Sequence, residues 1–106
     1  NGSDEVLNFA FMAFCQNGAA FADITYGFYK VFADLHGIET QIIPLKDDFS
    51  ISADDYKSLG KAVFIANPNA PTGMALSISD IEKIVASKEM FTLFWFRKSE
   101  HFLIIV

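Results

Sequence analysis

The chain has 106 residues, enough for one domain with one modest hydrophobic core. Its formal net charge is −5, and Arg97 is its single arginine. This balance excludes the basic surface that binds a nucleic-acid backbone, so we expect no nucleic-acid partner. With 52% apolar and only 20% charged residues, the chain is more apolar than a small free-standing domain usually is. We therefore expect a piece of a larger α/β protein.

Cysteine and histidine usage limits the chemistry further. Cys15 has no second cysteine with which to form a disulfide, and His36 and His101 do not make a zinc ligand set. We expect no metal and a reducing compartment, which for this chain means the cytoplasm. Residues 1–5 lack the positive charge of a secretory signal, and no apolar run reaches the roughly 20 residues that a membrane helix needs. We expect neither a signal peptide nor a membrane partner.

Helices and strands are expected to alternate along the first 87 residues. Ser3 is a suitable N-cap for a first helix that stops at Asn17 and Gly18, and this helix is apolar almost all round, which predicts burial on most sides. Ser52 and Ser79 each open a capping-box pattern at the start of a later helix. The expected order is helix 3–16, strand 19–24, helix 26–35, strand 40–45, short helix 52–60, strand 62–66 and helix 79–87.

The run 62–66 is apolar without interruption, as is typical of a central strand covered on both faces. Together with the alternation, it predicts an α/β layer architecture with mostly parallel strands and right-handed crossovers. Ligands of such folds bind at the carboxyl ends of the strands.

Residues 91–106 change in character. Two strongly apolar runs flank the charged segment 97–101, a pattern that predicts two strands joined by a charged turn. As an exposed pair they would be prone to aggregation.

Two segments combine the groups that a phosphate or planar ligand needs. At Gly2, Ser3 and Asp4, free backbone N–H groups, a hydroxyl and the helix dipole would converge, which favours an anion site. On the local pattern alone, an ordinary N-cap with acidic residues in its first turn is the favoured explanation of the same residues.

The loop 67–73 follows the best strand and carries two carboxamides, Asn67 and Asn69, on a backbone stiffened by two prolines. Its position favours a ligand role, and the alternative is a tight connection held by Asx turns. Tyr26 also follows a strand. It could present its ring to a planar ligand or be a half-buried tyrosine at a helix start.

Taken in order, residues 2–5 (Gly-Ser-Asp-Glu), 23–29 (Asp-Ile-Thr-Tyr-Gly-Phe-Tyr) and 66–73 (Ala-Asn-Pro-Asn-Ala-Pro-Thr-Gly) resemble the start of the large domain of fold type I, pyridoxal-phosphate-dependent aminotransferases. The likeness extends from residue 1 to about 87 and is strongest to the histidinol-phosphate branch. It implies a fragment of the α/β large domain in residues 1–87, followed by an unmatched hydrophobic tail in residues 88–106. The tail resembles the translation of a shifted or unrelated frame.

The resemblance also implies roles for individual residues toward pyridoxal 5′-phosphate. Gly2, Ser3 and Asp4 would hold the cofactor phosphate through their backbone, and Tyr26 would lie against the pyridine ring. An asparagine of the loop would bond the phenolic oxygen. Because Ala70 stands where the family usually has this asparagine, either Asn69 takes the role through a shifted backbone or the contact is lost.

The lysine that bonds covalently to the cofactor has no match in this sequence, so we name no catalytic residue and expect the isolated chain to be inactive. The resemblance implies that the complete enzyme is a homodimer that exchanges an amino group between histidinol phosphate and 2-oxoglutarate in histidine biosynthesis. Two alternatives remain open: a non-catalytic fragment that binds the cofactor or a partner subunit, and a chain whose tail associates with membrane or chaperone.

Overall fold

The computed structural model describes residues 3–57, 59–69, 72–87, 93–97 and 101–105, with side chains from residue 4 to residue 87 of these ranges. Its centre is one five-stranded sheet with the strand order β2-β1-β3-β5-β4. The first three strands are parallel, whereas β5 runs antiparallel to β3, and β4 antiparallel to β5. The strands are β1 (Ala19–Ala22), β2 (Thr40–Ile43), β3 (Ala62–Ala66), β4 (Leu93–Arg97) and β5 (His101–Ile105).

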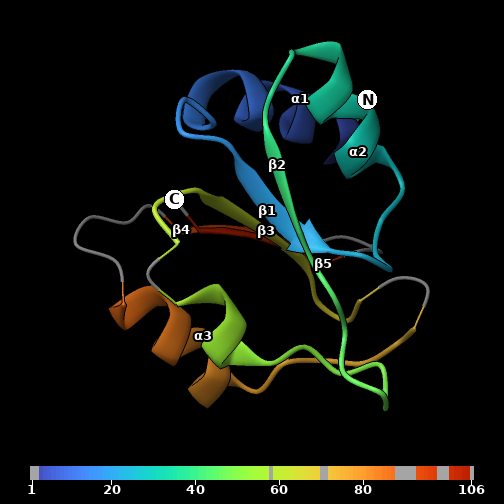
Figure 1. Cartoon of the computed structure of the whole chain (residues 1–106), viewed down its shortest axis with the longest axis vertical. Helices are drawn as coiled ribbons and strands as arrows, with labels where there is room; N and C mark the ends of the chain where they lie inside the picture. The colour runs from blue at the N-terminus through green and yellow to red at the C-terminus, as the bar shows by residue number, and fades with distance from the viewer. Residues whose placement is uncertain (1–2, 58, 70–71, 88–92, 98–100, 106) are drawn as a thin grey trace.

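Helices cover both faces of this sheet. Helices α1 and α2 lie on one side, and α3 lies on the other (Figure 1). The helical elements are α1 (Ser3–Phe14), α2 (Phe28–Leu35), the 3₁₀ turn η1 (Ala53–Tyr56) and α3 (Ile78–Ala86). The expected alternation of helices and strands is confirmed.

Alternation along the strands divides the core into two layers, because successive side chains of a strand point to opposite faces. On β3, Phe64 packs toward α1 and α2, while Val63 and Ile65 pack toward η1 and α3. All five residues of β3 are buried, which confirms the expected central strand.

Helix α1 departs from the prediction that it is buried on most sides. Leu7 and Phe11 pack on the sheet, but Phe9 is 58% exposed and Met12 is 59% exposed. One stripe of a straight helix can face a sheet, and no other described segment packs over the opposite stripe. The helix ends at Phe14, earlier than the predicted residue 16. The predicted break at Gly18 is confirmed: Gly18 has a φ of 98°, and a Cβ there would lie 2.9 Å from the Glu39 carbonyl oxygen.

Both predicted capping boxes are wrong in detail. Ser52 makes no side-chain cap, and the element after it is a single 3₁₀ turn that ends at Tyr56 instead of Gly60. Ser79 lies inside α3, because Ser77 has the extended backbone of an N-cap and its Oγ accepts a bond from Asp80 N at 3.1 Å. Serines two positions apart offer similar patterns in sequence, and only the backbone turn selects between them.

Replacing Ser77 with alanine is expected to lower the free energy of unfolding by about 1 kcal/mol, because one N–H group of the first turn loses its acceptor. Urea unfolding followed by circular dichroism measures this change. The matched control is Ser79→Ala, two residues away on the same helix, for which we expect a change within about 0.5 kcal/mol. Equal losses in the two variants would contradict the assignment of the cap.

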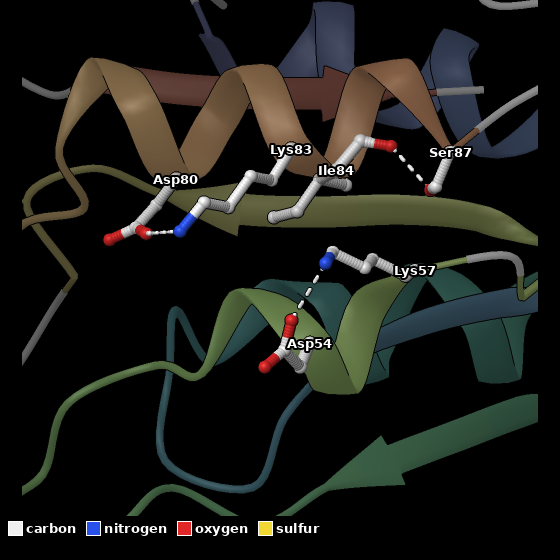
Figure 2. Close-up of polar contacts among 6 residues, drawn as sticks. All are labelled: Asp54, Lys57, Asp80, Lys83, Ile84 and Ser87. Carbon is white, nitrogen blue, oxygen red and sulfur yellow. Dashed lines mark hydrogen bonds and ion pairs between the residues drawn. The ribbon is translucent and has the colours of Figure 1, made fainter.

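Buried apolar side chains of η1 and α3 pack on the sheet, whereas the charged side chains of these elements interact with residues close in sequence. Figure 2 shows two ion pairs, Asp54 with Lys57 and Asp80 with Lys83, each between residues three apart. A hydrogen bond from the Lys57 ammonium, together with its positive charge, holds the pKa of the Asp54 carboxyl below its usual value. Because both pairs are exposed, they contribute little to stability. Tyr56 and Ile84 contribute more, because both are fully buried against the face of the sheet that η1 and α3 cover.

The predicted pair of strands in the tail is confirmed as β4 and β5, although residues 98–100 of the turn lie outside the described part. The pair is not separate from the rest of the fold, since residues 102–105 of β5 pair with residues 63–66 of β3. The division of the chain at residue 87 stays a prediction. Among the described helices, none has the length and apolar character needed to cross a membrane.

Candidate functional site

Three segments meet where the parallel strands end. The segment 23–26 leaves the carboxyl end of β1, and the loop from residue 67 leaves that of β3. Hydrogen bonds connect the segment 23–26 both to this loop and to the start of α1. This is the edge at which α/β folds bind their ligands, and it is the edge that the sequence predicts.

Tyr26 and Asp4, two of the predicted cofactor residues, lie in direct contact. The Tyr26 hydroxyl donates to Asp4 Oδ1 at 2.5 Å, across 22 residues of sequence. The Tyr26 ring is half-buried, with its centroid 5.7 Å from that of Tyr29 in an edge-on arrangement. Ser3 begins α1, its side chain is outside the described part, and Gly2 lies outside the described residues.

Asn69, the predicted partner of the cofactor's phenolic oxygen, is 1% exposed, and its amide is directed into the protein. Its Oδ1 accepts from Thr25 Oγ1 at 2.7 Å, and its Nδ2 donates to the Ile24 carbonyl oxygen at 2.8 Å. The role of Asn69 as a direct partner of the cofactor stays a prediction.

The loop after β3 is closed by bonds from its own backbone and from Asn67. The backbone N–H of Asn69 donates to Met74 O at 2.8 Å, and Asn67 Oδ1 accepts from Leu76 N at 2.8 Å while its Nδ2 donates to Leu76 O at 3.4 Å. The side-chain bonds described for Asn67 and Asn69 therefore reach distant residues, and the alternative of two Asx turns is wrong for them.

Sequence reasoning missed Asp23 and Thr25 as members of this edge. Asp23 Oδ1 accepts from Leu45 N at 3.0 Å and from Ile24 N at 2.9 Å, which joins the end of β1 to the segment after β2. The sequence offered only their position as a signal, because Asp23 directly follows a buried strand and Thr25 lies shortly after it. Nothing in the local pattern marks a threonine hydroxyl as the partner of an amide 44 residues away.

The family model for class I and II aminotransferases matches residues 1–94. The chain therefore belongs to that family. It is similar to the histidinol-phosphate aminotransferase of a Marinomonas species, with 58% identity over 88 residues that cover 80% of this chain and 25% of the relative. The same enzyme of Brachyspira hyodysenteriae is 48% identical over 91 residues, which cover 84% of this chain and 26% of the relative.

Solved structures of the family share the fold. One from Erwinia carotovora, assigned as a histidinol-phosphate aminotransferase, superposes with a TM-score of 0.69 and 26% identity over 82% of this chain and 28% of its own. Another from Burkholderia pseudomallei, assigned as an aminotransferase, gives 0.67 and 25% identity over 81% of this chain and 27% of its own. The expected α/β fold of an aminotransferase large-domain fragment is confirmed. The chain spans about a quarter of the length of these relatives.

Proposed function

We propose that this chain supplies the part of a histidinol-phosphate aminotransferase that holds the phosphate and ring of pyridoxal 5′-phosphate. The observation that carries the proposal is the contact of Tyr26 with Asp4, at the edge where β1 and β3 end. It brings an aromatic ring and a helix N-terminus together, the two features that a phosphorylated aromatic cofactor needs. The high identity to histidinol-phosphate aminotransferases supports the choice within the family.

The donor chemistry of the edge fits this cofactor. Helix α1 has 12 residues, and the first four N–H groups of a helix have no partner inside it, so they are available to phosphate oxygens. The Asp4 carboxylate would repel a phosphate, but the Tyr26 hydroxyl bonds one of its oxygens. The backbone at Ser3 and Asp4 would hold the phosphate, and the Tyr26 ring would lie against the pyridine ring.

The bound cofactor would carry the amino group exchanged between an amino acid and a 2-oxo acid. The residues of this chain would bind and orient it. We propose that this chain does not turn over alone, because no lysine of its sequence matches the one that bonds covalently to the cofactor in this family. The whole protein would act on histidinol phosphate and 2-oxoglutarate in histidine biosynthesis, as a cytoplasmic homodimer.

Calorimetric titration of the chain with pyridoxamine 5′-phosphate tests the site, because this form has the same ring and phosphate but no aldehyde that would react with surface lysines. We expect saturable binding. Tyr26→Ala is expected to weaken it by about three- to tenfold, as the ring contact is lost, and Tyr26→Phe, which keeps the ring, is expected to stay closer to the parent chain.

The control is Phe9→Ala, which removes an exposed aromatic side chain from α1 and is expected to leave the dissociation constant unchanged. Absence of saturable binding by the parent chain would contradict the proposal. Equal affinities for Tyr26→Ala and the parent chain would remove Tyr26 from the site.

A further inference from the structure

The segment that carries Tyr26 is held on two sides by side chains from other parts of the chain. On one side, the Asp23 carboxylate accepts a hydrogen bond from the backbone N–H of Leu45, which follows β2. On the other side, the Asn69 amide accepts from the hydroxyl of Thr25 and donates to the carbonyl of Ile24, the two residues directly before Tyr26.

The Asn69 amide is well placed to hold the segment before Tyr26 in position. It is almost fully buried, and its own backbone is bonded on both sides, with N–H donating to Met74 O and the carbonyl accepting from Gly73 N at 2.7 Å. These bonds hold the backbone of Asn69, and the bonds to Thr25 and Ile24 hold its amide in one orientation. The Thr25 hydroxyl is the donor to its oxygen in the structure, and a buried acceptor that loses its donor is costly.

We propose that Thr25 and Asn69 are a pair of positioning residues that orient Tyr26 toward Asp4 and the start of α1. The proposal deepens the proposed function, on which it rests: the pair acts on the cofactor through Tyr26. Thr25 ties Tyr26 to the loop after β3, while the Tyr26 hydroxyl ties it to α1. The orientation of one ring thus depends on three segments far apart in sequence.

The test compares Thr25→Val, which keeps the shape and removes the hydroxyl, with Thr25→Ser, which keeps the hydroxyl and removes the methyl group. Nuclear magnetic resonance of the full chain follows hydrogen exchange of the Asn69 side-chain amide and the ring resonances of Tyr26. In Thr25→Val we expect exchange to be about tenfold faster, a shifted Tyr26 ring and about tenfold weaker binding of pyridoxamine 5′-phosphate. Thr25→Ser is expected to restore all three.

Thr40→Val is the matched control, because it makes the same change at the opposite end of the parallel strands, where Thr40 pairs with Ala19. Unchanged Asn69 exchange and Tyr26 resonances in Thr25→Val would overturn the proposal. If that variant does not fold, Thr25→Ser decides: parental values support the hydroxyl, and a shifted Tyr26 ring overturns it. If the parent chain does not bind the cofactor form, the proposed function fails, while the exchange and resonance measurements still decide whether the pair positions Tyr26.

Discussion

Phe64→Ala is expected to lower the free energy of unfolding by about 3–5 kcal/mol, the usual cost of removing a fully buried aromatic side chain. Phe64 is 1% exposed at the middle of β3, and its ring stacks on that of Phe11 with centroids 4.0 Å apart and planes 12° from parallel. The Tyr29 ring lies 5.7 Å from it. Removal of the ring leaves a cavity between the sheet, α1 and α2.

Urea unfolding followed by circular dichroism measures this loss. Because a domain of this size is stabilised by only about 5–15 kcal/mol, the variant is expected to populate unfolded chain at low denaturant. Phe9→Ala is the control, since it removes the same side chain from an exposed position of α1, and we expect a change within about 0.5 kcal/mol. Similar losses in the two variants would contradict the division of α1 into a packed and an exposed stripe.

Cys15 is expected to react with iodoacetamide about a thousandfold more slowly in the folded chain than in urea. Burial raises the pKa of its thiol from 9.0 to about 12, and the thiolate is the reactive form. The chain has no other cysteine, so the mass of the alkylated product reports this thiol alone. Rates within tenfold of each other at pH 8, folded and in urea, would contradict the assigned burial.

The same thiol makes folding depend on pH. Its folded-state pKa is raised, so its contribution to stability is complete below pH 9 and is lost as the pH rises toward 12. Between pH 8 and pH 10 the expected loss is about 1.4 kcal/mol. In Cys15→Ala most of the loss between pH 8 and pH 10 should disappear. A further loss of stability above pH 10 is expected from Tyr56 in both chains, since burial also raises the pKa of its phenol. A Cys15→Ala chain with the parental loss between pH 8 and pH 10 would refute the assignment.

The order of elements could be predicted because the signals for it are local. An uninterrupted apolar run marks β3, apolar side chains at helical spacing mark α2, and Gly18 marks the end of the first helix. The prediction of Ser79 as a cap failed for the same reason, because Ser77 also satisfies the local pattern and the chain turns there instead.

The features of the site also separate into those that the sequence predicts and those that only the folded structure shows. The sequence by itself determined the family, through the motifs at residues 2–5, 23–29 and 66–73, and the edge of the sheet at which those motifs gather. Only the tertiary structure decided that Asn69 faces inward to Thr25, that Tyr26 meets Asp4, and that Cys15 is buried.

The physical reason is the distance in sequence over which each property is set. Element type and motif identity follow from residues a few positions apart, as spacing and backbone preference act locally. The direction of a buried amide, the partner of a hydroxyl and the pKa of a thiol depend on groups that folding brings together from remote segments. Asn69 and Thr25, 44 positions apart, become partners only when β1 and β3 lie side by side.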